Sequence, residues 1–95
     1  MAGHPPVIPP EVAEVIRHLS PDVKRAVKAA IRTIGANPAA GQPLQRELKG
    51  LWKFRVRRFR ILYRIDRATS SVRITAVGER RSIYEEVAEL LRSQK

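Results

Sequence analysis

The sequence predicts an α+β fold, in which two N-terminal helices pack on a small antiparallel sheet of three to four strands and a C-terminal helix follows. Three observations carry this prediction. Apolar residues recur at helical spacing between residues 11 and 34, alternate with other residues from 52 to 77, and return to helical spacing after residue 82. Residues 1–95 are expected to form a single domain with a thin core, whose first ten residues are extended.

Two helices are expected in the first part of the chain. The first ten residues hold four prolines, so a strand there can only be a short edge strand. Residues 11–19 place their apolar side chains on one helical face. Residues 20–22, Ser-Pro-Asp, suit the start of a second helix, which is expected to run to about Ile34 and to end at Gly35 and Asn37. Residues 38–43 are expected to form a loop.

The middle of the chain predicts a β-hairpin over residues 52–66 with one apolar face and one cationic face. If residues 57–58 form the tip, Val56 lies opposite Phe59, and every large apolar residue falls on the same face. A slip of one residue would destroy this match, so the register is well specified. A third strand over residues 72–77 is expected to turn Val72, Ile74 and Ala76 toward the helices.

The net charge of +10 is concentrated in one segment of the chain. Residues 49–81 hold eleven lysines and arginines against two acids, whereas residues 1–48 hold six against four and residues 82–95 hold two against three. A solubilising surface is the alternative explanation, but the hairpin register places Arg55 directly opposite Arg60. Like charges across a strand pair are destabilising unless an anion such as phosphate lies between them. The cationic face is therefore expected to bind a polyanion, with RNA favoured.

The residues that the sequence lacks narrow the class of function. There is no cysteine, which excludes disulfides and thiolate zinc sites. The two histidines, His4 and His18, lie far from the basic segment, so we expect no metal site and no cofactor. The N-terminus has no basic region followed by an apolar stretch, and no apolar run exceeds three residues. We therefore expect a cytoplasmic protein with no membrane partner.

The last helix is expected to begin at Ser82, which with Glu85 forms a capping box, and to end near Arg92. Tyr84 starts the apolar stripe of this helix, and its spacing favours a core aromatic. The alternative is that Tyr84 reaches the rim of the cationic face, together with residues 79–81 where the chain leaves the sheet. Spacing leaves both interpretations of Tyr84 open.

Three stretches of the chain resemble the RelE/ParE toxin superfamily. They are residues 48–56 (LKGLWKFRV), 59–66 (FRILYRID) and 77–84 (VGERRSIY), and the two preceding helices fit the same architecture. The resemblance implies a toxin of a toxin–antitoxin pair, bound by a cognate acidic antitoxin in a hetero-oligomer. It also implies one of two activities, because members of the RelE branch cleave messenger RNA on the ribosome and members of the ParE branch inhibit DNA gyrase.

In the RelE branch, cleavage uses basic residues on the strands and an arginine and a tyrosine after the last strand. The matching catalytic residues here are Lys53, Arg60, Arg80 and Tyr84, and Arg55 matches a phosphate-binding position. This set favours a metal-independent endoribonuclease, an mRNA interferase that inhibits translation. Further contacts to RNA phosphates are expected from the other basic residues of this face, namely Arg57, Arg58, Arg64, Arg73 and Arg81.

The implied reaction is attack of an RNA 2′-OH on the adjacent phosphodiester. Lys53 is the candidate base, Arg60 and Arg80 would stabilise the phosphorane, and Tyr84 would stack on a base or place a proton. The sequence departs from the family pattern at Glu79, where many relatives carry histidine, at the hairpin tip, and in its proline-rich start. Gyrase inhibition and nucleic-acid binding without catalysis are the alternative functions. The basic face could also be mainly the docking surface of the antitoxin.

Overall fold

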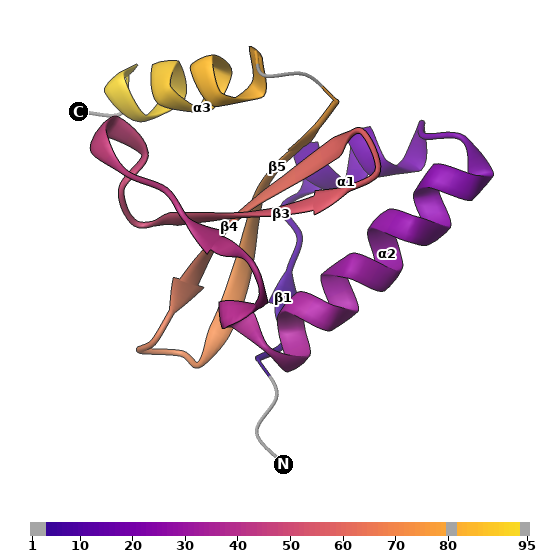
Figure 1. Ribbon diagram of the computed structural model, residues 1–95, viewed down its shortest axis with the longest axis horizontal. Helices are drawn as coiled ribbons and strands as arrows, with labels where there is room; N and C mark the ends of the chain where they lie inside the picture. The colour runs from indigo at the N-terminus through magenta and orange to yellow at the C-terminus, as the bar shows by residue number, and fades with distance from the viewer. Residues whose placement is uncertain (1–3, 80–81, 94–95) are drawn as a thin grey trace.

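The computed structural model describes residues 4–79 and 82–93, which form a five-stranded sheet with helices on both faces. Helices α1 and α2 cover one face, and α3 lies over the other (Figure 1). The strand order is β1-β5-β4-β3-β2. The elements, in chain order, are β1 (Pro6–Val7), α1 (Pro10–Arg17), α2 (Pro21–Ala36), the 3-10 helix η1 (Pro38–Ala40), β2 (Gln42–Pro43), the 3-10 helix η2 (Arg46–Leu48), β3 (Leu51–Val56), β4 (Phe59–Asp66), β5 (Ser71–Gly78) and α3 (Ser82–Ser93).

The predicted α+β class is confirmed, and all three helices form where their apolar periodicity places them. Ser20 occupies the N-cap position of α2, although its side chain makes no capping hydrogen bond. Helix α3 starts at Ser82 and ends one residue after the predicted Arg92. The predicted capping box of α3 depends on the Ser82 side chain, which lies outside the described part of the chain.

Helix α2 continues two residues past the predicted Ile34, through Gly35 to Ala36, and Asn37, one of the residues predicted to end it, is its C-cap. Gly35 is buried against the N-terminal segment, where its carbonyl oxygen accepts the His4 N–H at 2.7 Å. A Cβ at this position would lie 3.0 Å from the His4 carbonyl oxygen. The glycine therefore allows two chain segments to approach closely, and this contact holds β1 at the edge of the sheet.

The sheet is larger than the predicted three to four antiparallel strands, because two edge strands of two residues each are added to the meander of β3, β4 and β5. Strand β1 is the short edge strand that the prolines allow. It pairs in parallel with β5, which makes the sheet mixed, while β2 pairs antiparallel with β3. Strands this short carry no alternation of side chains from which their pairing could be predicted.

The predicted hairpin register is confirmed, with Val56 opposite Phe59 and Arg55 opposite Arg60. The tip turns at residues 57–58, where Arg57 has a φ of 55°. A left-handed conformation costs a non-glycine residue about 1–2 kcal/mol. The apolar match along the strands thus fixes the turn even though the tip lacks the glycine that tight hairpins favour.

A β-bulge in the pairing of β4 with β5 changes which residues of β5 face the two N-terminal helices. Leu62 pairs with Ala76 and Tyr63 pairs with Ile74, so Thr75 is the extra residue on β5. The side-chain alternation of β5 reverses at this point. Ala76 therefore packs in the cluster under α3, which contradicts its predicted orientation, and Val77 takes its place against α1 and α2.

The face that the sequence presents as cationic is divided into a covered half and an open half. Leu51 and Leu62 lie on this face and are fully buried, in a cluster with Ile83 and Val87 of α3. The opposite face carries the larger core against α1 and α2. Helix α3 therefore covers the end of the face at which Leu51 lies and leaves the end near the hairpin tip open (Figure 1).

Tyr63 connects the larger core to the loop between α2 and β3. Its side chain is fully buried, and its ring stacks on Trp52 with centroids 6.3 Å apart. The hydroxyl donates to the Pro38 carbonyl oxygen at 2.5 Å and accepts the Gly41 N–H at 3.1 Å. A Cβ at Gly41 would collide with this hydroxyl and with the Lys53 carbonyl oxygen. The loop can therefore approach the sheet only with glycine at position 41.

The variant Tyr63→Phe is expected to lower the free energy of unfolding by about 1–3 kcal/mol, because the Pro38 carbonyl and the Gly41 N–H lose their partner in a partly buried place. Urea denaturation followed by circular dichroism measures the change. Tyr84→Phe is the matched control, since its hydroxyl has no hydrogen bond to the described residues. Equal stability of both variants would contradict this role of the Tyr63 hydroxyl.

Stability is also expected to depend on pH through Tyr63. Burial raises the pKa of the Tyr63 phenol above its ordinary value of 10.0, and the Gly41 N–H offsets part of that rise. Above pH 10.0 the unfolded chain therefore loses this proton before the folded chain does, so the contribution of Tyr63 is complete below that pH and declines above it. The difference in unfolding free energy between the unsubstituted protein and Tyr63→Phe, measured from about pH 8 to pH 11, should decline only above pH 10. A constant difference over this range would contradict the shift.

Candidate functional site

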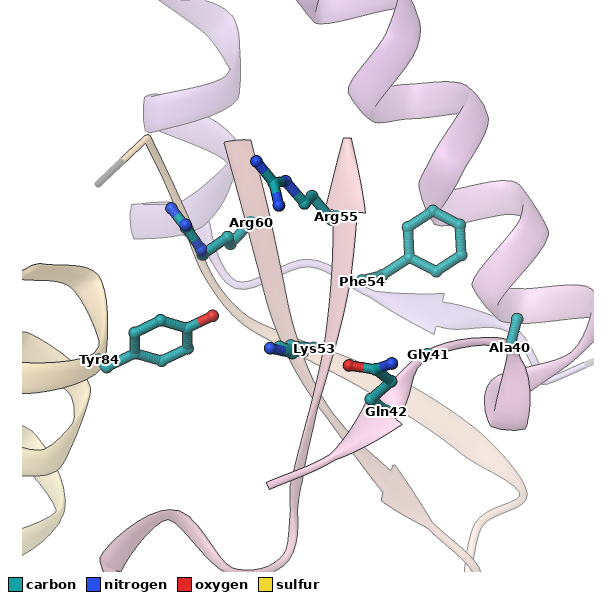
Figure 2. Close-up of a pocket in the computed structure, with 8 residues that line it drawn as sticks. All are labelled: Ala40, Gly41, Gln42, Lys53, Phe54, Arg55, Arg60 and Tyr84. Atoms are coloured by element: carbon teal, nitrogen blue, oxygen red, sulfur yellow. The ribbon is translucent and has the colours of Figure 1, made fainter. Parts of the chain in front are cut away.

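The open half of the cationic face forms a groove of about 780 Å³, here called the basic groove. Strands β3 and β4 supply its cations, the loop and strand around β2 form one side, and the start of α3 forms the other (Figure 2). The residues that line it are Ala40, Gly41, Gln42, Lys53, Phe54, Arg55, Arg60 and Tyr84. The structure thus brings four of the predicted site residues together, namely Lys53, Arg55, Arg60 and Tyr84.

The cations of the basic groove come from neighbouring positions of the hairpin. Lys53 and Arg55 are two residues apart on β3 and point to the same side of the sheet, and Arg60 lies directly across from Arg55 on β4. The Arg55 Nε also donates to the carbonyl oxygen of Arg57 at 3.3 Å, which ties the side chain to the hairpin tip. Among residues 4–79 and 82–93, none that lines the groove is acidic. An anion that entered the groove would therefore relieve the repulsion between the facing guanidinium groups.

Arg60 is the most firmly held of these cations. Its Nη1 donates to the carbonyl oxygen of Glu79 at 3.1 Å, and its Cζ lies 5.8 Å from the centre of the Tyr84 ring. The side chain is half-buried, and a cation over an aromatic face is stabilised by the ring. The guanidinium is therefore oriented before any ligand arrives.

Tyr84 satisfies both of the interpretations that spacing left open. Its ring packs against the cluster of Leu51, Leu62, Ile83 and Val87, and it also lines the basic groove. Its hydroxyl points toward the space in which Lys53 ends (Figure 2). Gly78 permits this position, because a Cβ there would lie 3.0 Å from the Cβ of Ile83 and would hold α3 away from the sheet.

The hairpin tip lies outside the basic groove. Arg57 and Arg58 are exposed, and the Arg58 Nε lies 3.6 Å from the Glu79 carboxylate. Glu79 therefore binds two arginines, Arg58 through its side chain and Arg60 through its backbone. Sequence reasoning noted Glu79 only as a departure from the family pattern. Contacts between the end of β5 and the hairpin tip give no signal in the sequence.

The remaining predicted phosphate-binding residues are separate from the basic groove. Arg64 and Arg73 are exposed and face each other across β4 and β5, and neither lines the groove. Arg80 and Arg81 lie outside the described residues. Four groove residues were not predicted as site residues. Ala40, Gly41 and Gln42 come from the segment that the sequence presents only as a loop, and Phe54 comes from β3.

Neither a metal-binding cluster nor a membrane-spanning helix is present in the described part of the chain. Over residues 4–79 and 82–93, no group of three or more histidine, cysteine, aspartate or glutamate side chains could hold a metal ion. Within the same residues, the helices are too short or too polar to span a bilayer.

Solved structures from toxin–antitoxin systems share this fold. The chain is 29% identical to a chain of the RelBE2 toxin–antitoxin complex of Mycobacterium tuberculosis, with a TM-score of 0.76 over 84% of this chain and 94% of the other. A mutant of the E. coli toxin RelE in the free state has a TM-score of 0.75 at 16% identity, covering 95% and 97% of the two chains. The intact E. coli RelBE complex contains a chain with a TM-score of 0.69 at 17% identity, covering 82% and 98%. The two E. coli likenesses concern the fold alone.

Comparison with sequences identifies the family. No significant match was found among curated protein sequences. A family profile described as the ParE toxin of type II toxin–antitoxin systems, parDE, matches residues 11–84. This range includes α1, α2, the hairpin and the groove residues up to Tyr84. The chain therefore belongs to the RelE/ParE superfamily of toxins from type II toxin–antitoxin systems.

Proposed function

We propose that this toxin is an endoribonuclease, an mRNA interferase that cleaves messenger RNA on the ribosome and so inhibits translation. The observation that carries the proposal is the convergence of Lys53, Arg55, Arg60 and Tyr84 on one groove. Guanidinium and ammonium groups on the floor of a groove can hold a phosphodiester. An aromatic ring at its rim can stack on an unpaired base, which is a common way for proteins to bind single-stranded RNA.

In the proposed reaction, the 2′-oxygen of a ribose attacks the adjacent phosphorus, and the bond from phosphorus to the 5′-oxygen of the next nucleotide breaks. The products are a 2′,3′-cyclic phosphate and a 5′-hydroxyl. Lys53 is assigned the removal of the 2′-hydroxyl proton, and Arg55 holds the phosphate. Tyr84 stacks on a base or delivers a proton to the leaving oxygen.

Arg60 is assigned the stabilisation of the phosphorane. Its contacts to the Glu79 carbonyl and the Tyr84 ring support this role, because a preorganised donor lowers the barrier by about 3–4 kcal/mol. Arg80 is given the same role from the family resemblance. Contacts to the RNA backbone outside the groove are assigned to Arg57, Arg58, Arg64, Arg73 and Arg81.

Two macromolecular partners belong to this proposal, both met in the cytoplasm. The first is messenger RNA on the ribosome. The second is a cognate acidic antitoxin, whose carboxylates would complement the basic residues of the groove. The M. tuberculosis and E. coli relatives occur in RelBE toxin–antitoxin complexes, which supports a hetero-oligomer of this kind.

Inhibition of DNA gyrase is the second candidate function, and the match to the ParE family favours it. A supercoiling assay with purified gyrase and RNA end mapping in a cell-free translation mixture separate the two. Cut transcripts with normal supercoiling support the nuclease, and intact transcripts with blocked supercoiling support the gyrase inhibitor. A protein that binds RNA but changes neither readout would be a nucleic-acid-binding protein without catalysis.

The variant Arg60→Ala is expected to slow mRNA cleavage in a cell-free translation mixture by about 100-fold or more, because a preorganised donor to the phosphorane is lost. Arg67→Ala is the matched control, since it removes the same charge from the exposed turn between β4 and β5, outside the groove. The control should cleave within a few-fold of the unsubstituted protein. Similar losses in both variants would show that charge alone matters and would contradict a specific role of Arg60.

Binding of single-stranded RNA is expected to weaken steeply with salt, because phosphate contacts release counterions. Each contact adds about 0.7 to the slope of log affinity against log salt. The three groove contacts, from Lys53, Arg55 and Arg60, contribute about −2 to this slope, and contacts outside the groove add to it. Arg55→Ala should reduce the magnitude of the slope by about 0.7. Fluorescence anisotropy of a labelled RNA over a range of potassium chloride concentrations measures both. A slope unchanged by Arg55→Ala would mean that Arg55 does not contact phosphate.

A further inference from the structure

Among the described residues that line the basic groove, one polar side chain has no role in the proposed reaction. The cations recognise phosphate and the Tyr84 ring recognises the face of a base, and neither contact distinguishes one RNA sequence from another. Gln42 also lines the groove. Its side chain ends in a planar carboxamide, which offers a hydrogen-bond donor and an acceptor side by side. We propose that Gln42 reads the edge of an RNA base held in the basic groove, an inference that rests on the proposed function.

The position of Gln42 suits a reading residue because its backbone is fixed on both sides. Gln42 pairs with Lys53 in the sheet, so the two side chains start from adjacent positions. The preceding Gly41 N–H donates to the Tyr63 hydroxyl at 3.1 Å, and the N–H of Leu44, two residues after Gln42, donates to the Leu51 carbonyl oxygen at 2.8 Å. Contacts of this kind hold a site on a rigid element, which specific recognition requires.

The Gln42 carboxamide is available to a ligand. The residue is exposed, and among residues 4–79 and 82–93 no partner hydrogen-bonds to its side chain. In Figure 2 the carboxamide points into the groove beside Lys53, and Tyr84 faces it from the opposite side. A base that stacks on Tyr84, with its phosphate held by Arg55 and Arg60, would turn its hydrogen-bonding edge toward Gln42.

The donor–acceptor pattern determines how substitutions should change the preferred base. The carboxamide donates one hydrogen bond and accepts another, so it can match one edge atom of each kind. The substitution Gln42→Ala would remove both hydrogen bonds to the base edge but leave every phosphate contact in place. Glutamate at that position only accepts hydrogen bonds, which suits the adjacent N–H donors of guanine and disfavours bases with a ring acceptor there.

The test is to map cut sites by sequencing RNA ends from a cell-free translation mixture that contains the unsubstituted protein, Gln42→Ala or Gln42→Glu. Gln45→Glu is the matched control, because it adds the same charge at an exposed position three residues away that does not line the groove. The unsubstituted protein should prefer particular bases at one position beside the cut by about 10-fold, as one bidentate base contact provides.

Three results would support the inference together: Gln42→Ala cuts the preferred sites about 10-fold more slowly and the other sites at a similar rate, so that the preference is lost, Gln42→Glu moves the preference toward guanine, and Gln45→Glu keeps it. Cleavage with the same base preference in Gln42→Ala and Gln42→Glu overturns the inference and leaves the nuclease assignment intact. If Gln45→Glu also loses the preference, the loss is an effect of the added charge, and the inference is overturned. No cleavage by the unsubstituted protein overturns the nuclease assignment, and this inference with it.

Discussion

In the β3–β4 hairpin, the pairing of Phe54 with Ile61 decides on which face of the sheet the other side chains of both strands lie. The apolar residues on one side join the core under α1 and α2. Because side chains alternate, Lys53, Arg55 and Arg60 must then emerge together on the other side. The same alternation places Leu51 and Leu62 under α3, and this cluster brings Tyr84 to the edge of the groove. A single register therefore positions both the cations and the phenol.

The core and the groove are joined by a small number of contacts through the backbone. The Tyr63 hydroxyl, which belongs to the larger core, holds the loop from Pro38 to Gly41 that forms one side of the groove. Glu79 connects the end of β5 to Arg58 and Arg60 on the hairpin. The ion pair between Arg58 and the Glu79 carboxylate is exposed and contributes little stability. The hydrogen bond from Arg60 to the Glu79 carbonyl oxygen is therefore the more important of the two contacts. The groove thus depends on glycine at position 41 and on the backbone carbonyl of Glu79.

The sequence predicted the helices and the hairpin register, because each rests on a periodic pattern. The same register placed Lys53, Arg55 and Arg60 on one face, whereas Tyr84 was predicted as a site residue from the family resemblance. The two edge strands could not be predicted, since two residues carry no alternation. The bulge at Thr75 could not be located either, because it depends on how β5 fits β4 across a turn. Arg64 and Arg73 have the same charge as Arg55 but lie at another place on the sheet. Charge in the sequence predicted the kind of ligand, and only the fold separated the groove from the surrounding surface.

The Arg55–Arg60 pair also links the function of the protein to its lifetime. Two cations held face to face oppose folding as long as the groove is empty, and the apolar register must overcome that repulsion. Any polyanion that binds the folded groove and not the unfolded chain raises the free energy of unfolding in proportion to the logarithm of its concentration. A chain that is released from its ligands is then the form most open to proteolysis. The feature that would make the groove bind RNA therefore also limits how long the free protein survives without a partner.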